Sequence, residues 1–168
     1  MQDGIDLEWR HLREVLERYG ETAVALYKQN LTASGRPASG ALADSLRTVV
    51  VAGDTEIAVD LSLLEYYKYI EHGTRPHWAP IAPIKDWVNV VYNKKLLPRP
   101  LPNGKLPTPT QLAYMVQHKI AREGTEGKDD LGRALQETWE RMAQDISDAI
   151  TADISEDLDY VLSFLLVP

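Results

Sequence analysis

The chain has 168 residues, 44% of them hydrophobic and 26% charged, a composition typical of a globular protein with its own core that excludes a disordered chain. It contains no cysteine, which excludes disulfides, zinc–thiolate sites and thiol nucleophiles. The net charge of −7 argues against nucleic-acid binding by the chain as a whole.

The first predicted element is a long amphipathic helix over residues 6–31, because apolar residues recur there at spacings of three and four. A short helix from Ser39 to about Leu46 follows. The period then changes to two, and Arg47–Ala52 and Thr55–Leu61 predict an antiparallel hairpin joined at Gly53–Asp54. One hairpin face is polar, so the first helix is expected to cover the other.

Three further helices are predicted in the middle of the chain. Ser62–Glu65 is a capping box that predicts a helix from Leu63 to His72. A proline suited to a first helical turn precedes a helix over 84–93. Thr108–Gln111 is a second capping box, and its helix is expected to end at Gly124. The proline-rich residues between the last two helices predict a loop.

The last predicted helix starts near Asp129 or Asp130, and its apolar residues step by three or four as far as Ile154. The chain then closes on Asp159–Val167, where seven of nine residues are apolar. Chain termini are usually polar. This segment, helix or strand, therefore either docks on the chain's own core or inserts into a partner.

These elements predict one α+β domain over residues 1–168. Its long N-terminal and C-terminal helices pack on a small antiparallel sheet, the hairpin at about 47–61. A helical and loop insertion at about 76–124 contributes a helical pair. No stretch has the ~18 apolar residues of a membrane helix, and no basic segment followed by an apolar one opens the chain. We therefore expect a soluble protein without a signal peptide.

The sequence contains no recognisable catalytic or metal-binding pattern. No serine lies in a G-x-S-x-G motif, and no glycine-rich loop leads into Lys-Ser/Thr. His72 and His77 lack the spacing of a helical metal-ligand pair. We therefore expect no enzymatic activity, no metal and no cofactor. A small hydrolase is the alternative that a measured activity would favour.

Charge is distributed unevenly along the chain. Residues 75–105 carry six Lys/Arg and one Asp, whereas residues 129–160 carry ten Asp/Glu and two Arg. They are either two solvated faces or the complementary surfaces of a head-to-tail ring. In the second case, Lys94 and Lys95 are expected at the contact. The same basic residues leave a small DNA-binding regulator as another alternative.

The segment Tyr66–Pro80 has the highest density of aromatic residues. Gly73 is expected to take a positive φ, and Pro76 biases Arg75 towards an extended conformation. The result is a fixed bend that presents Arg75, His77 and Trp78, and rigid aromatic residues with arginine are typical of interface hot spots. Packing of the tyrosine rings over the hairpin is the other interpretation.

The order of elements, together with a motif of the form Y-x-x-Y-[IL]-E-x-G-T-R-P, resembles the tail-completion or head–tail joining (neck) proteins of long-tailed bacteriophages and prophages. The matching residues are Tyr66, Tyr69, Ile70, Glu71, Gly73, Thr74, Arg75 and Pro76. The closing acidic helix, preceded by Arg122–Thr125, is similar to members of the family that have an extra helical insertion. The resemblance covers roughly residues 6–155, although about fifty residues separate the first Gly-Thr from the last helix, where the family often has a short Pro-Phe-Leu segment.

The resemblance implies a non-enzymatic α+β virion protein, made in the bacterial host cytoplasm. It would form a ring, commonly sixfold and otherwise twelvefold, through which genomic DNA passes without specific recognition. Implied partners are other copies, neighbouring connector proteins and tail-terminator or tail-tube proteins, with no membrane. Another connector component, such as a tail terminator or head-completion protein, is the first alternative. The expected interface residues are Tyr66, Tyr69, Glu71, Gly73, Thr74, Arg75, Pro76, His77, Trp78, Lys94, Lys95, Phe164, Leu165 and Leu166.

Overall fold

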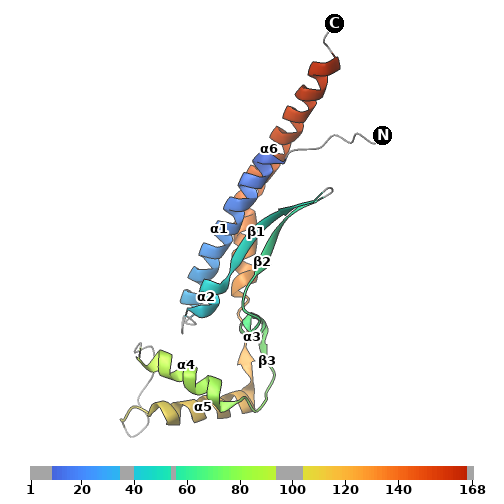
Figure 1. Cartoon of the computed structure of the whole chain (residues 1–168). Coiled ribbons are helices and arrows are strands. Elements are labelled where there is room, and N and C mark those ends of the chain that lie inside the picture. Colours follow the sequence, from blue (N-terminus) through green and yellow to red (C-terminus); the bar gives the residue numbers. More distant parts are fainter. Residues whose placement is uncertain (1–8, 35–39, 54–55, 94–103, 166–168) are drawn as a thin grey trace. The chain divides into compact units, whose positions relative to one another are not determined.

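A computed structural model describes residues 9–34, 40–53, 56–93 and 104–165 (Figure 1). Two two-stranded antiparallel sheets accompany the helices of these residues, so the predicted α+β class is confirmed. The elements are α1 (Arg10–Ala33), α2 (Ala41–Ser45), β1 (Arg47–Ala52), β2 (Ile57–Ser62), α3 (Tyr67–His72), β3 (Gly73–Thr74), α4 (Ile81–Asn93), α5 (Pro109–Glu123), β4 (Thr125–Glu126) and α6 (Asp130–Leu165).

Contacts within the chain divide it into two compact units. The first unit comprises residues 1–29, 46–62 and 132–168, and the second comprises residues 30–45 and 63–131. The single domain over residues 1–168 stays a prediction. None of the helices in the described ranges is long and apolar enough to span a membrane.

The core of the first unit lies between the antiparallel helices α1 and α6 (Figure 1). Its buried residues are Leu12, Val15, Met142, Ile146 and Ala149. Apolar residues at spacings of three and four give each helix one continuous apolar face, and these two faces form the cluster. Ile57 of the hairpin packs against it. The long N-terminal and C-terminal helices therefore pack on the hairpin, as predicted.

The hairpin has one half-buried face and one exposed face. Thr48 pairs with Leu61, and Val50 pairs with Val59; three of these four side chains are half-buried, and Leu61 is only slightly more exposed. On the opposite face, Val49 is 60% exposed. The second strand begins two residues later than predicted, because Ala52 pairs with Ile57 and the Gly53 N–H donates to the Glu56 carbonyl at 2.8 Å. The rest of the predicted turn lies outside the described residues.

The buried stripe of α6 combines two of the large apolar residues that the sequence suggests, Met142 and Ile146, with small and polar residues. It consists of Ala134, Thr138, Met142, Ile146, Ala149 and Asp153. Trp139 and Ile154, both members of the predicted stripe, are 51% and 48% exposed. Thr138 satisfies its hydroxyl by donating to the Ala134 carbonyl at 2.7 Å, so its burial leaves no donor unpaired.

The second unit has a core of its own between α4 and α5. The buried residues are Ala79, Ile84, Val88, Leu112 and Ala113. Helix α5 follows the prediction, because Thr108 and Gln111 form both hydrogen bonds of the capping box and the helix ends at Gly124. Helix α4 begins at Ile81, three residues before the predicted start, and so includes Pro83 in its first turn, where a missing N–H costs no hydrogen bond.

The predicted capping box at Ser62–Glu65 is wrong. Ser62 is the last residue of β2 and pairs with Arg47, so its backbone is committed to the sheet. Helix α3 begins only at Tyr67, after a turn in which the Tyr67 N–H donates to the Leu64 carbonyl at 3.0 Å. The Leu64 N–H instead donates a hydrogen bond to the Ser45 hydroxyl at 3.1 Å. Sheet pairing therefore overrides the local helix signal.

Candidate functional site

Two Gly-Thr steps that lie far apart in the sequence pair with each other in the second unit. β3 and β4 are antiparallel, with Gly73 opposite Glu126 and Thr74 opposite Thr125. The hydroxyls of Thr74 and Thr125 lie 3.0 Å apart, within hydrogen-bonding distance. This pairing, which we call the glycine clasp (residues 73–74 and 124–127), joins the end of α3 to the end of α5.

Glycines are required in the clasp for two independent reasons. Gly73 and Gly124 end their helices with φ angles of +69° and +75°, a region that side chains other than glycine rarely adopt. The strands also approach so closely that a Cβ at Gly73 would overlap the Thr125 carbonyl, and a Cβ at Gly124 would overlap the Thr74 carbonyl. The positive φ predicted for Gly73 is confirmed.

Glu71 lies inside the protein and caps a helix. Its side chain is only 4% exposed. One oxygen of the Glu71 carboxylate accepts a hydrogen bond from the Leu131 N–H at 2.9 Å. The backbone carbonyl of Glu71 accepts another from the Asp129 N–H at 3.2 Å. Because these N–H groups lie at the N-terminus of α6, the carboxylate satisfies donors that the helix itself leaves free. Glu71, expected at an interface, thus has an internal role.

The residues after the clasp face outward. Arg75, Pro76, His77 and Trp78 are exposed, Trp78 by 64%. Hydrogen bonds fix the bend, because His77 Nδ1 lies 2.9 Å from the Arg75 carbonyl and the His77 N–H donates to the Ile120 carbonyl at 3.4 Å. The structure therefore has the predicted arrangement, in which a constrained backbone presents Arg75, His77 and Trp78.

Helix α5 extends this exposed surface with further aromatic contacts. The Trp78 ring meets the His118 ring edge to face, with centroids 5.1 Å apart. The Lys85 ammonium lies 5.7 Å from the centroid of the Tyr114 ring. Tyr114 precedes His118 by one turn of α5. Met115, beside them on α5, is 50% exposed. We call the exposed set Trp78, Tyr114, Met115 and His118 the aromatic strip.

The other predicted interface residues fall in different places. Tyr66 and Tyr69 are 41% and 57% exposed, so neither ring is packed away in the chain. Leu165 is 73% exposed and ends α6, and the described part of the closing segment is therefore helix. Phe164 lies within α6, with its side chain outside the described set. Lys94, Lys95 and Leu166 also lie outside the described residues.

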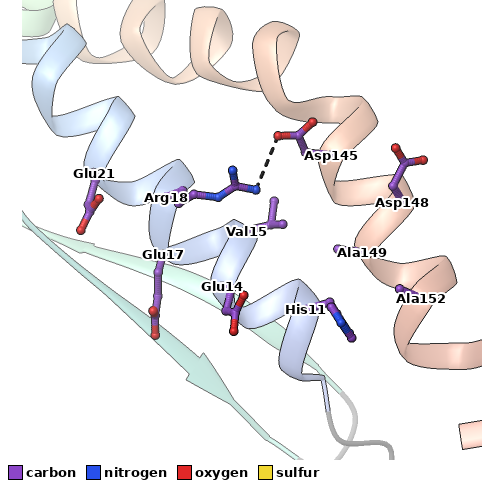
Figure 2. A pocket seen from close by; sticks show the side chains of 10 residues that line it. All are labelled: His11, Glu14, Val15, Glu17, Arg18, Glu21, Asp145, Asp148, Ala149 and Ala152. Carbon is purple, nitrogen blue, oxygen red and sulfur yellow. Dashed lines mark ion pairs between the residues drawn. The ribbon is translucent and has the colours of Figure 1, made fainter. Parts of the chain in front are cut away.

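A groove of about 650 Å³ lies between α1 and α6 in the first unit (Figure 2). Arg18 reaches across it to Asp145, with an N–O distance of 3.5 Å and both side chains more than half exposed, so the pair contributes little. No group of three potential metal ligands occurs in the described ranges, and we assign the groove no ligand. Its lining residues are His11, Glu14, Val15, Glu17, Arg18, Glu21, Asp145, Asp148, Ala149 and Ala152.

Sequence reasoning missed that the second Gly-Thr is the partner of the first. The only available signal was the similarity between His72-Gly73-Thr74 and Glu123-Gly124-Thr125, each placed where a helix ends. No protein-family model matches this chain, and no curated protein or solved structure is significantly similar to it.

Proposed function

We propose that this chain is a structural assembly protein of a tailed bacteriophage or prophage. It forms part of a ring at the head–tail junction and acts through protein contacts around the DNA channel, without catalysing a reaction. The motif from Tyr66 to Pro76, which resembles that of tail-completion and neck proteins, supports this proposal.

The observation that carries the proposal is the contrast, around this motif, between a locked backbone and exposed side chains. Glu71 and Gly73 are held by capping bonds and strand pairing, whereas Arg75, His77 and Trp78 face outward. Because the backbone here is already fixed, little backbone entropy is lost when Arg75 and Trp78 meet a partner. Residues of these types supply much of the binding energy at protein interfaces.

The distribution of charge supports contacts between copies. The ranges of the first unit contain 7 Lys/Arg and 17 Asp/Glu, a net charge of −10, while those of the second contain 11 Lys/Arg and 8 Asp/Glu, a net charge of +3. Opposite charge on two parts of one chain favours a head-to-tail contact between copies, which builds a ring when the rotation closes.

Deleting the gene from its phage or prophage tests this function. We expect DNA-filled heads and separate tails by electron microscopy, and joined particles again when the wild-type chain is supplied. The Arg75→Ala, Trp78→Ala double variant is expected to fold but not to restore joining. Trp139→Ala is the matched control, because Trp139 is also an exposed tryptophan (51%) but belongs to α6 and not to the segment Tyr66–Pro80.

Joined, infectious particles formed without the chain would contradict the proposal. The copy number and position of this chain in purified particles distinguish a neck ring from a tail terminator or a head-completion protein. A mobility assay with duplex DNA addresses the regulator alternative, since sequence-selective binding at physiological salt is expected of a regulator and not of a ring through which DNA slides.

A further inference from the structure

The C-terminal end of α6 has an apolar face without a partner among the described residues. Ile154, Leu158, Leu162 and Leu165 are between 40% and 73% exposed, and Val161 among them is half-buried. Their spacings of four and three place them on one side of the helix. We call this set the α6 apolar face. Large exposed apolar surfaces of this kind mark interaction sites.

Acidic side chains surround the α6 apolar face. From Met142 to Leu165 the helix contains six Asp/Glu and no Lys or Arg. One of them, Asp153, is buried, and Glu156 is paired with Arg10 at 2.6 Å. The others include Asp157 and Asp159, next to the apolar face. An anionic rim of this kind repels acidic partners and anionic membranes and favours a partner that surrounds an apolar surface with cations.

The aromatic strip on the second unit has the complementary chemistry. Trp78, Tyr114 and Met115 are between 46% and 64% exposed, and aromatic residues and methionine are enriched at protein interfaces. Lys85 lies over Tyr114, and α5 adds Lys119, one turn after Met115 and exposed. The strip is thus an apolar surface with a cationic rim.

We propose that the α6 apolar face of one copy docks on the aromatic strip of a second copy of this chain. The inference rests on the proposed function and identifies which surfaces join neighbouring subunits. Two different surfaces are used, so a joined pair keeps one free α6 apolar face and one free aromatic strip, and a further copy can be added. The contact places aliphatic side chains on aromatic rings and the carboxylates of Asp157 and Asp159 near the rim formed by Lys85 and Lys119.

Pairing of two α6 apolar faces with each other explains the observations less well. Such a contact brings the acidic rims of two identical helices together, which is destabilising at low salt. It also leaves the aromatic strip exposed. The contact between α6 and the strip covers both apolar surfaces and brings opposite charges together.

Cysteine pairing between two differently sized chains tests this contact, because the natural chain has no cysteine. A Leu158→Cys chain is mixed with a longer, tagged Met115→Cys chain and oxidised, and the mixed disulfide is measured by gel mobility. Ser163→Cys replaces Leu158→Cys in the control. Ser163 is exposed, and at 100° per residue it lies on the opposite side of the helix from the α6 apolar face.

We expect roughly tenfold more mixed disulfide with Leu158→Cys than with Ser163→Cys, corresponding to about 1.4 kcal/mol of preference. The yield should fall as salt is raised from about 50 to about 500 mM, since Asp159 and Lys119 are exposed and salt screens exposed charges. Adding Leu162→Glu to the Leu158→Cys chain should reduce the yield several-fold. Circular dichroism checks that this variant keeps its helix content.

Equal yields from Leu158→Cys and Ser163→Cys at every protein concentration would overturn the inference. So would a predominance of disulfides between two Leu158→Cys chains, which would indicate that the α6 apolar faces meet each other. A disulfide formed within one chain carrying both cysteines, in preference to mixed pairs, would assign the contact to a single copy. These results are independent of the particle experiment, so a chain found at the neck without this disulfide contradicts the contact alone.

Discussion

Asp153 of α6 caps the N-terminus of α1 and pairs with His11 in the first turn of that helix. One carboxylate oxygen accepts from the His11 N–H at 2.9 Å and lies 2.8 Å from the His11 ring nitrogen Nδ1. The other accepts from the Leu12 N–H at 2.9 Å. Because Asp153 is 1% exposed, these bonds compensate for its loss of water, and they fix the register of α1 against α6.

Asp153→Asn should therefore destabilise the first unit. The amide keeps one acceptor but places an NH₂ group against a backbone donor, and it loses the charge that favours the helix N-terminus. We expect a loss of about 2 kcal/mol in the free energy of unfolding, measured by urea denaturation. Asp159→Asn is the control, because Asp159 is an exposed acidic residue of the same helix. Equal stabilities of the two variants would contradict the capping role.

The same pair predicts how stability depends on pH. Burial alone would raise the pKa of Asp153, but the hydrogen bonds from Leu12 and His11 outweigh it, and the pKa lies below its usual 3.8. The hydrogen bond with Asp153 raises the pKa of His11 above its usual 6.5, helped by Glu156. His11 thus stabilises the fold below about pH 6.5 and loses this effect as the pH rises through its raised pKa. Asp153 stabilises it above about pH 3.8 and loses this effect as the pH falls through its lowered pKa.

The free energy of unfolding should consequently be highest, as far as this pair contributes, between about pH 4 and pH 6.5. His11→Gln is expected to remove the decline on the alkaline side and to leave most of the decline on the acid side, where Asp153 still caps the helix. Denaturant titrations of both proteins from pH 3 to pH 9 measure this. A difference between them that stays constant across neutral pH would show that His11 does not titrate against Asp153.

Local signals explain which parts of this structure the sequence predicts. The capping box of Thr108 and Gln111 needs only residues three apart, and β1 follows from a β-branched run over Arg47–Ala52. From the sequence alone, Asp153 would be interpreted as one more solvated carboxylate on an acidic helix. The backbone N–H groups that donate to it lie 141 and 142 residues away. Burial of a charged residue becomes predictable only once its partners are known.

The candidate site divides in the same way. The bend at Gly73 and the outward position of Trp78 follow from local conformational rules, since glycine permits a positive φ and Pro76 biases Arg75 towards an extended conformation. The inward position of Glu71 depends on the N-terminus of α6, which begins about sixty residues later. Without that helix, a glutamate at the end of a tyrosine-rich segment is more easily interpreted as exposed.

The clasp predicts a large difference between two kinds of glycine substitution. Gly73→Ala and Gly124→Ala each place a Cβ against a backbone carbonyl at a positive φ, and we expect each to cost roughly 3 kcal/mol or more. Gly104 is the matched control, because its φ is +76° but a Cβ there meets nothing within 4 Å. Gly104→Ala should cost only about 1–2 kcal/mol. Thermal unfolding followed by circular dichroism measures all three, and equal losses would mean that the close approach of β3 and β4 contributes nothing.

The contact between α1 and the hairpin predicts that Gly20→Ala is destabilising. In a helix interior, replacing glycine by alanine normally raises the free energy of unfolding by about 1 kcal/mol. At Gly20, however, a Cβ would lie 2.6 Å from the Thr48 hydroxyl oxygen and 2.8 Å from its Cβ, so β1 must move away from the helix. We expect a net loss of about 1–3 kcal/mol in urea denaturation. The loss should be smaller in a Thr48→Ala background, because that change removes the nearest atom and the two positions are coupled through direct contact. If Gly20→Ala were instead as stable as the wild type, the helix and the hairpin would have to lie further apart than the structure places them.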